Sequence, residues 1–125
     1  MSSEALKEIL KMTLKEMSPV ILHIALAPVH ELVHVILALL RGEKIIEVDW
    51  FSHVLTIAKK MPTFAEYVGE EFFAEFVRSA VVYYLTRKIG NKYLLAVILS
   101  LPFLNAIKSA TRYLTRKHLV AAMVK

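Results

Sequence analysis

The apolar residues near the start of the chain recur every three or four positions, between charged ones. These residues are Leu6, Ile9, Leu10, Leu14 and Met17. Such spacing is typical of an amphipathic helix, and Ser2 or Ser3 is placed to cap its first turn. The charges within this segment argue against a cleavable signal sequence.

A longer apolar segment runs from Val20 to Leu40. The Ser-Pro pair at 18–19 predicts its start, with Ser as the N-cap and Pro in the first helical position. At about 1.5 Å per residue, this segment is long enough to cross the hydrocarbon core of a bilayer. We expect Pro28 to kink the helix or to start a fresh one, and Arg41-Gly42 to end it.

The pattern then changes to a period of two. In KIIEVDWF, Ile46, Val48 and Trp50 share one face while acidic residues occupy the other, which is typical of a half-buried strand. A second β-prone run, HVLTIAKK, follows a short turn near Ser52. Together the two runs predict a β-hairpin.

A further helix is expected after the hairpin. Thr63 and Glu66 have the spacing of a capping box at its start. Gly69 is a candidate break in its first turns, and Gly90 is the expected stop.

The last part of the chain, from Lys92 onward, predicts one or two helices bent at Pro102. No internal repeat, linker or low-complexity run divides the sequence. We therefore expect residues 1–125 to form a single domain of the α+β class, mainly α with a small β-hairpin.

The composition of the chain favours contact with a membrane. Hydrophobic residues make up 57% of the chain and the mean hydropathy is +0.53, which is high for a small soluble domain. All 11 acidic residues lie in 1–76, whereas 77–125 carries nine Lys and Arg and no acid. These basic residues alternate with long aliphatic runs, which favours an anionic lipid surface over nucleic acid. The expected localisation is membrane-associated, integral or peripheral, and otherwise cytoplasmic.

The sequence PVHELVH carries the candidate chemistry. It places His30, Glu31 and His34 in an otherwise apolar helix, where unpaired ionisable groups are costly to bury. Residues four apart lie on one helical face, so the two histidines can share one metal ion, while Glu31 can accept a proton from an activated water. The chain has no cysteine, so the remaining ligands must be histidine or carboxylate. The alternative is packed or surface histidines beside a solvated Glu31.

A third ligand is expected from the downstream sequence EEFFAEF. Glu71 and Glu75 lie four residues apart on one helical face, and Ala74 between them allows close approach of another helix. Arg78 can pair with Glu75 at i, i+3 spacing. The alternative is that both acids form a solvated face near a helix N-terminus.

His-Glu-x-x-His followed by Glu-x-x-Ala-Glu on a second helix resembles the gluzincin metallopeptidases, in particular the minigluzincins and the related catalytic domains of integral-membrane metallopeptidases. The resemblance implies a zincin-like arrangement in which the His-Glu-x-x-His helix packs on a Glu-bearing helix. It implies a site made of His30, His34 and Glu71 as Zn2+ ligands, Glu31 as general base and Glu75 as the partner of a ligand histidine. A different helix phase would put Glu70 in place of Glu71.

The run HELVHVILALLRGEKIIEV also resembles the site-2 protease family of intramembrane metalloproteases. That family takes its third ligand from the Asp of a Leu-Asp-Gly motif on a later helix. The nearest match here is LPFLNA, with Asn105 in the Asp position and Ala106 in the Gly position. Because neutral Asn is a poor zinc ligand, this departure favours Glu71.

These patterns together predict a zinc-dependent metallopeptidase that acts on a peptide or protein substrate. The alternative is a non-enzymatic helical protein that binds a membrane or a partner and whose His-Glu-x-x-His is incidental or a relic. His23, seven residues before His30 on nearly the same face, either lines the site or packs within the fold.

Overall fold

The structure, a computed structural model, describes residues 2–57 and 61–124, with side chains described up to Thr115. Its elements in chain order are α1 (Ser3–Ala25), α2 (Ala27–Leu40), β1 (Lys44–Asp49), β2 (His53–Ile57), α3 (Phe64–Thr86) and α4 (Lys92–Val124). The expectation of a mainly helical chain with a two-stranded antiparallel hairpin is confirmed.

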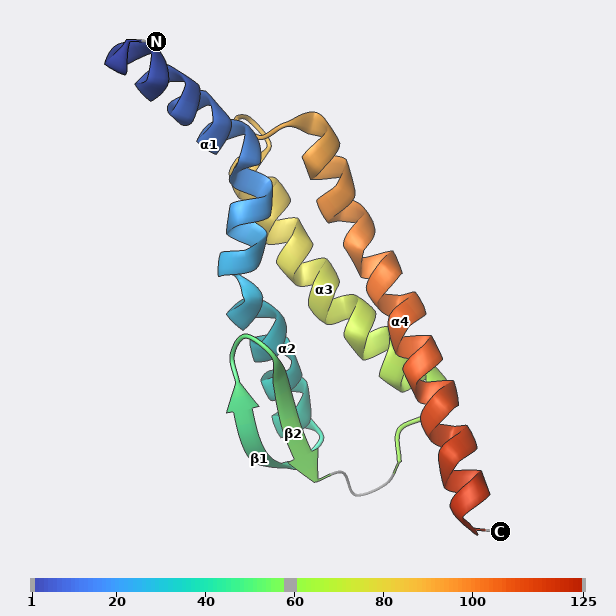
Figure 1. The fold of residues 1–125 in the computed structure, drawn as a ribbon. Coiled ribbons are helices and arrows are strands. Elements are labelled where there is room, and N and C mark those ends of the chain that lie inside the picture. The colour runs from blue at the N-terminus through green and yellow to red at the C-terminus, as the bar shows by residue number, and fades with distance from the viewer. Residues whose placement is uncertain (1, 58–60, 125) are drawn as a thin grey trace.

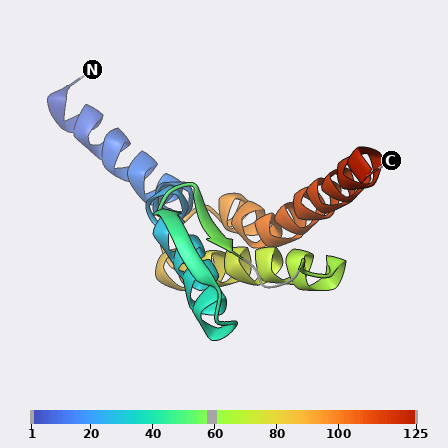
Figure 2. The same ribbon diagram turned by 90° about the horizontal axis from the view of Figure 1, so that it is seen from below.

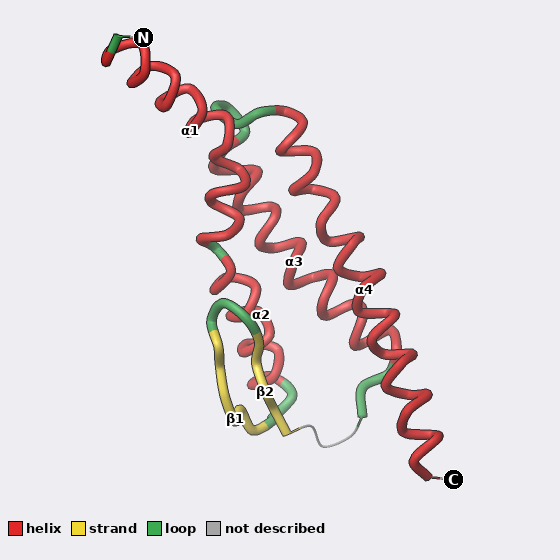
Figure 3. Tube along the Cα trace, in the orientation of Figure 1, coloured by secondary structure: helices red, strands yellow, loops and turns green. Residues whose placement is uncertain are grey.

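Three helical columns lie side by side (Figure 1). One column is α1 continued by α2, and the others are α3 and α4. Helix α3 is the central element, because it contacts α1, α2 and α4. The hairpin packs on α2. It lies at the end of the bundle where α2 ends and α3 begins (Figures 1 and 3). The N-terminal part of α1 and the C-terminal part of α4 project in different directions from this bundle (Figure 2).

The starts of α1 and α3 are set by the expected caps. The Ala5 amide donates to the Ser2 hydroxyl at 3.1 Å, and the Glu66 amide donates to the Thr63 hydroxyl at 3.2 Å. Each contact satisfies one of the free N–H groups of a first helical turn. Helix α2 ends as expected beside Gly42, whose φ of 72° suits glycine.

The predicted helix start at Ser18 and Pro19 is wrong, because α1 continues through both residues to Ala25. Proline removes the N–H that would bond to the carbonyl four residues earlier, here that of Lys15. The Ser18 hydroxyl donates to that same carbonyl at 2.7 Å and so satisfies it. The helical column is interrupted at Leu26 instead, and Pro28 lies in the first turn of α2.

Of the three residues predicted to share the half-buried face of the first strand, only Val48 does so. The register between the strands shifts between Ile45 and Glu47, and such a bulge turns the following side chains to the opposite face. Ile45 and Val48 are therefore half-buried, while Ile46 and Trp50 are 60% and 44% exposed.

The two glycines near the ends of α3 play other parts than predicted. Gly69 does not break α3, which is continuous from Phe64 to Thr86. The helix ends four residues before Gly90, and a Cβ atom on Gly90 would lie 2.5 Å from the Pro19 side chain. Gly90 is thus required by the close approach of α1 to the link between α3 and α4.

Helix α4 is one helix that passes through Pro102, a fully buried residue. The completely apolar core is small, and its members are Ala38, Ala74, Val82, Leu95 and Ile98. Many large apolar side chains are exposed on all three columns, among them Ile24, Leu39, Phe76, Phe103 and Ile107. Two helical segments, Ser3–Leu40 and Lys92–Thr115, are long and apolar enough to cross a membrane.

Candidate metal centre

The two histidines of the motif converge at the centre of α2. Helical spacing puts His30 and His34 one turn apart, and each ring contacts a carboxylate of α3. Their Nε2 atoms lie 3.2 Å apart and their ring centroids 4.9 Å apart. The i, i+4 spacing in the sequence therefore brings two imidazole nitrogens to the same point.

Glu71 of α3 is the carboxylate that meets this pair. Its oxygens lie 3.3 Å from His34 Nε2 and 3.7 Å from His30 Nε2. The potential ligand atoms of the three residues all lie within 4.8 Å of one another. The structure thus brings together the three residues expected as Zn2+ ligands, in a cluster that could hold a metal ion.

Each ring nitrogen that faces away from this cluster lies next to a different carboxylate. His30 Nδ1 is 2.8 Å from Glu75 Oε2, and His34 Nδ1 is 3.1 Å from Glu70 Oε1. Glu75 is only 8% exposed at its side chain. When each Nδ1 donates to its carboxylate, the two Nε2 atoms carry lone pairs and point at each other, an arrangement that a bound cation stabilises.

Asn105 of α4 lies beside Glu71 rather than at the histidines. Its amide nitrogen donates to the Glu71 main-chain carbonyl at 3.0 Å and to Oε2 of the same residue at 3.4 Å. Glu70 likewise contacts the outer nitrogen of His34. Glu70 and Asn105, the two alternatives to Glu71, therefore contact His34 and Glu71 and can orient them.

His23 belongs to the same network through Glu75. Its Nε2 atom lies 2.6 Å from Glu75 Oε1. The Arg78 guanidinium is 3.6 Å from Glu75 Oε2 and donates to the His23 main-chain carbonyl. Glu75 thus contacts two imidazoles and one guanidinium, and these contacts fix the position of its carboxylate.

Glu31 is 6% exposed, and its Oε2 atom is buried without a hydrogen-bond partner among the described residues. A buried carboxylate oxygen without a partner is costly. Charges at His30, His34 and Glu71 act on the Glu31 carboxyl, which places it near the cluster.

The charges around the cluster favour a divalent cation. Four carboxylates and two guanidiniums lie in or beside it, which gives a formal charge of −2 when the histidines are neutral. The carboxylates are those of Glu31, Glu70, Glu71 and Glu75, and the guanidiniums are those of Arg41 and Arg78. Imidazole nitrogens with one carboxylate form a donor set that zinc prefers. The residues present therefore fit Zn2+ in both charge and donor type.

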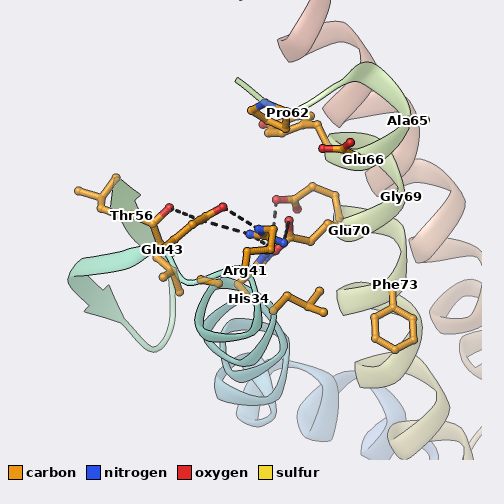
Figure 4. Close-up of a pocket in the computed structure, with 16 residues that line it drawn as sticks. His34, Arg41, Glu43, Thr56, Pro62, Ala65, Glu66, Gly69, Glu70 and Phe73 are labelled. Carbon is orange, nitrogen blue, oxygen red and sulfur yellow. Dashed lines mark hydrogen bonds and ion pairs between the residues drawn. The ribbon is translucent and has the colours of Figure 1, made fainter. Parts of the chain in front are cut away.

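A groove of about 1030 Å3 opens beside the cluster, between α2, β2 and the start of α3 (Figure 4). His34, Glu70 and Glu71 of the site are among the residues that line it. Its remaining wall is mostly apolar and includes Leu37, Ala38, Val54, Leu55, Pro62, Tyr67 and Phe73. The groove can therefore bring an elongated, partly apolar ligand to the cluster.

No protein-family model, curated protein or solved structure matches this chain. The geometry is thus the ground on which a function is assigned.

Sequence reasoning overlooked Arg41 as a residue of this site. Arg41 lines the groove and contacts Glu70 at 3.2 Å. A signal was present, since Arg41 follows His34 by seven residues and such positions share a helical face. Its place at the end of an apolar helix, before Gly42, suggested a terminator instead.

Proposed function

We propose that this protein is a zinc-dependent metallopeptidase. The observation that carries the proposal is the convergence of His30 Nε2, His34 Nε2 and the Glu71 carboxylate within 4.8 Å of one another. Support comes from the partner that each of these residues has on its outer side. Such outer partners fix ring orientation and raise ligand basicity in metal sites.

His30, His34 and Glu71 would hold the ion. Three protein ligands leave one position of a tetrahedral zinc site open to water or substrate. When bound, the ion supplies a Lewis acid that lowers the pKa of water and polarises a peptide carbonyl. The packing of α2 on α3 would then be zincin-like, with the His-Glu-x-x-His helix against the Glu-bearing helix.

Glu31 is the general base in this proposal. Its unpartnered Oε2 accepts a proton from the attacking water and passes the proton to the amine that leaves when the peptide bond breaks. Burial of the carboxylate keeps competing water away from that oxygen. Glu75 and Glu70 hold the histidines and take no part in proton transfer to the substrate.

The substrate is a peptide or protein segment in extended form. Among the described residues β2 pairs with β1 alone, and Val54, Leu55 and Thr56 of β2 line the groove. A free strand edge binds an extended chain by main-chain hydrogen bonds. A segment seated there would lie in the groove that His34, Glu70 and Glu71 also line.

We also propose that the protein lies in or on a membrane through its apolar helices. Many exposed side chains of α1, α2 and α4 are apolar, whereas Glu31 and Glu75 are buried and Glu71 is half-buried. Ionisable groups within membranes behave in this way, facing the protein interior and pairing with one another. Arg87, Lys88 and Lys92 at one end of the helices would contact anionic headgroups.

The test is metal analysis of purified protein paired with cleavage of a casein-type substrate. We expect about one zinc per chain for wild type and for Glu31→Gln, with cleavage by the wild type only. Glu71→Ala is expected to lose zinc sharply. Zinc content that is unchanged in Glu71→Ala would remove Glu71 from the site, and cleavage that survives Glu31→Gln would point to a contaminating protease.

A further inference from the structure

We infer that Arg41 is a positioning residue that couples the β-hairpin to the metal ligand His34. The inference rests on the proposed function, since it concerns the same metal centre and the groove beside it. Through Arg41, a ligand in the groove would change how tightly the centre binds metal.

The first half of the connection runs from Arg41 to the metal ligand. Arg41 Nη1 lies 3.2 Å from Glu70 Oε2, and Glu70 Oε1 lies 3.1 Å from His34 Nδ1. Glu70 is about four-fifths buried at its side chain, so its carboxylate has little water to bond. Arg41 therefore fixes the carboxylate that fixes the ring of His34.

The second half runs from Arg41 to the hairpin (Figure 4). Arg41 Nε donates to Glu43 Oε1 at 2.6 Å, and the Thr56 hydroxyl of β2 donates to Glu43 Oε2 at 3.0 Å. Hydrogen bonding from Arg41 outweighs burial and holds the pKa of Glu43 below its usual range, so the pair is charged at neutral pH. A continuous chain of polar contacts thus joins Thr56 to His34.

These polar contacts lie along the wall of the groove. Arg41, Glu43, Thr56 and Glu70 all line it, so a ligand seated against β2 lies beside every link. Thermodynamic reciprocity then requires that, if a ligand in the groove strengthens metal binding, the metal strengthens binding of that ligand by the same factor. An arginine that merely ended the helix would not contact both Glu70 and Glu43.

The first measurement is zinc affinity, by competition with a chromophoric chelator. We expect Arg41→Ala to bind zinc about tenfold more weakly than wild type. Arg41→Lys, which keeps the charge but loses the fork that reaches two carboxylates, should fall in between. Glu43→Gln should weaken zinc binding in the wild type and have no effect in Arg41→Ala. Arg87→Ala, an exposed arginine bonded to the Tyr84 carbonyl, is the matched control and should leave the affinity unchanged.

The second measurement is amide hydrogen exchange with and without zinc. Zinc should slow exchange over residues 53–57 in the wild type and in Arg87→Ala, and this slowing should disappear in Arg41→Ala. Equal zinc affinities and equal protection in wild type and Arg41→Ala would overturn the coupling while leaving the metal centre in place. A wild-type protein that binds no zinc would overturn the proposed function, and the coupling with it.

Discussion

The Nε2 atoms of His30 and His34 face each other at 3.2 Å, while the Nδ1 atom of each ring lies next to its own carboxylate. Two neutral imidazoles held in this way would direct two lone pairs at the same point, which is unfavourable unless a cation or a proton lies between them. The carboxylate of Glu71 at the same point balances the charge of either occupant, and with the two imidazoles it makes a donor set that is typical of a zinc site. This relationship is the basis for the predictions about metal.

Replacing Glu75 by Gln should weaken zinc binding by about 10–100-fold, the usual cost of losing an outer partner of a metal-ligating histidine. Gln keeps the size of the side chain but removes the negative charge that His23, His30 and Arg78 contact. Chelator competition measures the change. Glu47→Gln, at a side chain that is 59% exposed, is the control. Equal affinities for the two variants would show that Glu75 does not support the site.

Zinc should raise the thermal stability of the protein. The ligands come from α2 and α3, so metal binding adds a further tie between two helices that packing and the contacts of His30 with Glu75 and of His34 with Glu70 already join. Free zinc at a hundredfold excess over its Kd adds about 2.7 kcal/mol to the unfolding free energy, which corresponds to a rise of several degrees in Tm. Thermal melts with added zinc and with a chelator measure this.

The variant Glu71→Ala is the counterpart of that experiment. It removes the carboxylate at 3.3 Å from His34, so its Tm should respond to zinc far less than that of the wild type. A zinc-induced rise of the same size in both proteins would mean that the ion binds elsewhere.

Substitutions at Gly69 and Gly90 test the packing of α1 against the link between α3 and α4. A Cβ atom on Gly69 would meet nothing within 4 Å, and alanine is favoured over glycine inside a helix, so Gly69→Ala should stabilise the protein by about 1 kcal/mol. A Cβ atom on Gly90 would lie 2.5 Å from Pro19, so Gly90→Ala should destabilise it by roughly 1–3 kcal/mol. Denaturant or thermal unfolding measures both. A Gly90→Ala protein that is as stable as the wild type, or more stable, would contradict the close approach of Pro19 to Gly90.

The parts of the site that the sequence predicts are those fixed by helical periodicity. His30 and His34 must share a face once α2 forms, and Glu71 and Glu75 must do so on α3. Which of these residues meet one another depends on how the two helices pack. Periodicity alone therefore left Glu70 and Asn105 as alternatives to Glu71, and their places beside the ligands emerge only in three dimensions.

The errors in the fold come from local compensations that pattern rules omit. Proline predicts a helix boundary, but the Ser18 hydroxyl satisfies the carbonyl that Pro19 leaves free, so α1 continues. Alternation predicts the faces of a strand, but one extra residue near Ile46 puts Ile45, and not Ile46, on the half-buried face with Val48. In both cases a single residue cancels the signal of its neighbours.

Membrane insertion can be tested directly because the chain has no cysteine, so each introduced cysteine is the sole thiol. Val97 and Phe103 of α4 are 52% and 64% exposed, and Lys88 in the link after α3 is also exposed. In lipid nanodiscs, where both sides are accessible, a charged maleimide should label Lys88→Cys rapidly and the other two at least tenfold more slowly. Lipid, rather than protein, would shield those two positions, so denaturation should make all three label equally. Equal rates before denaturation would place α4 in water and remove the membrane from the proposal.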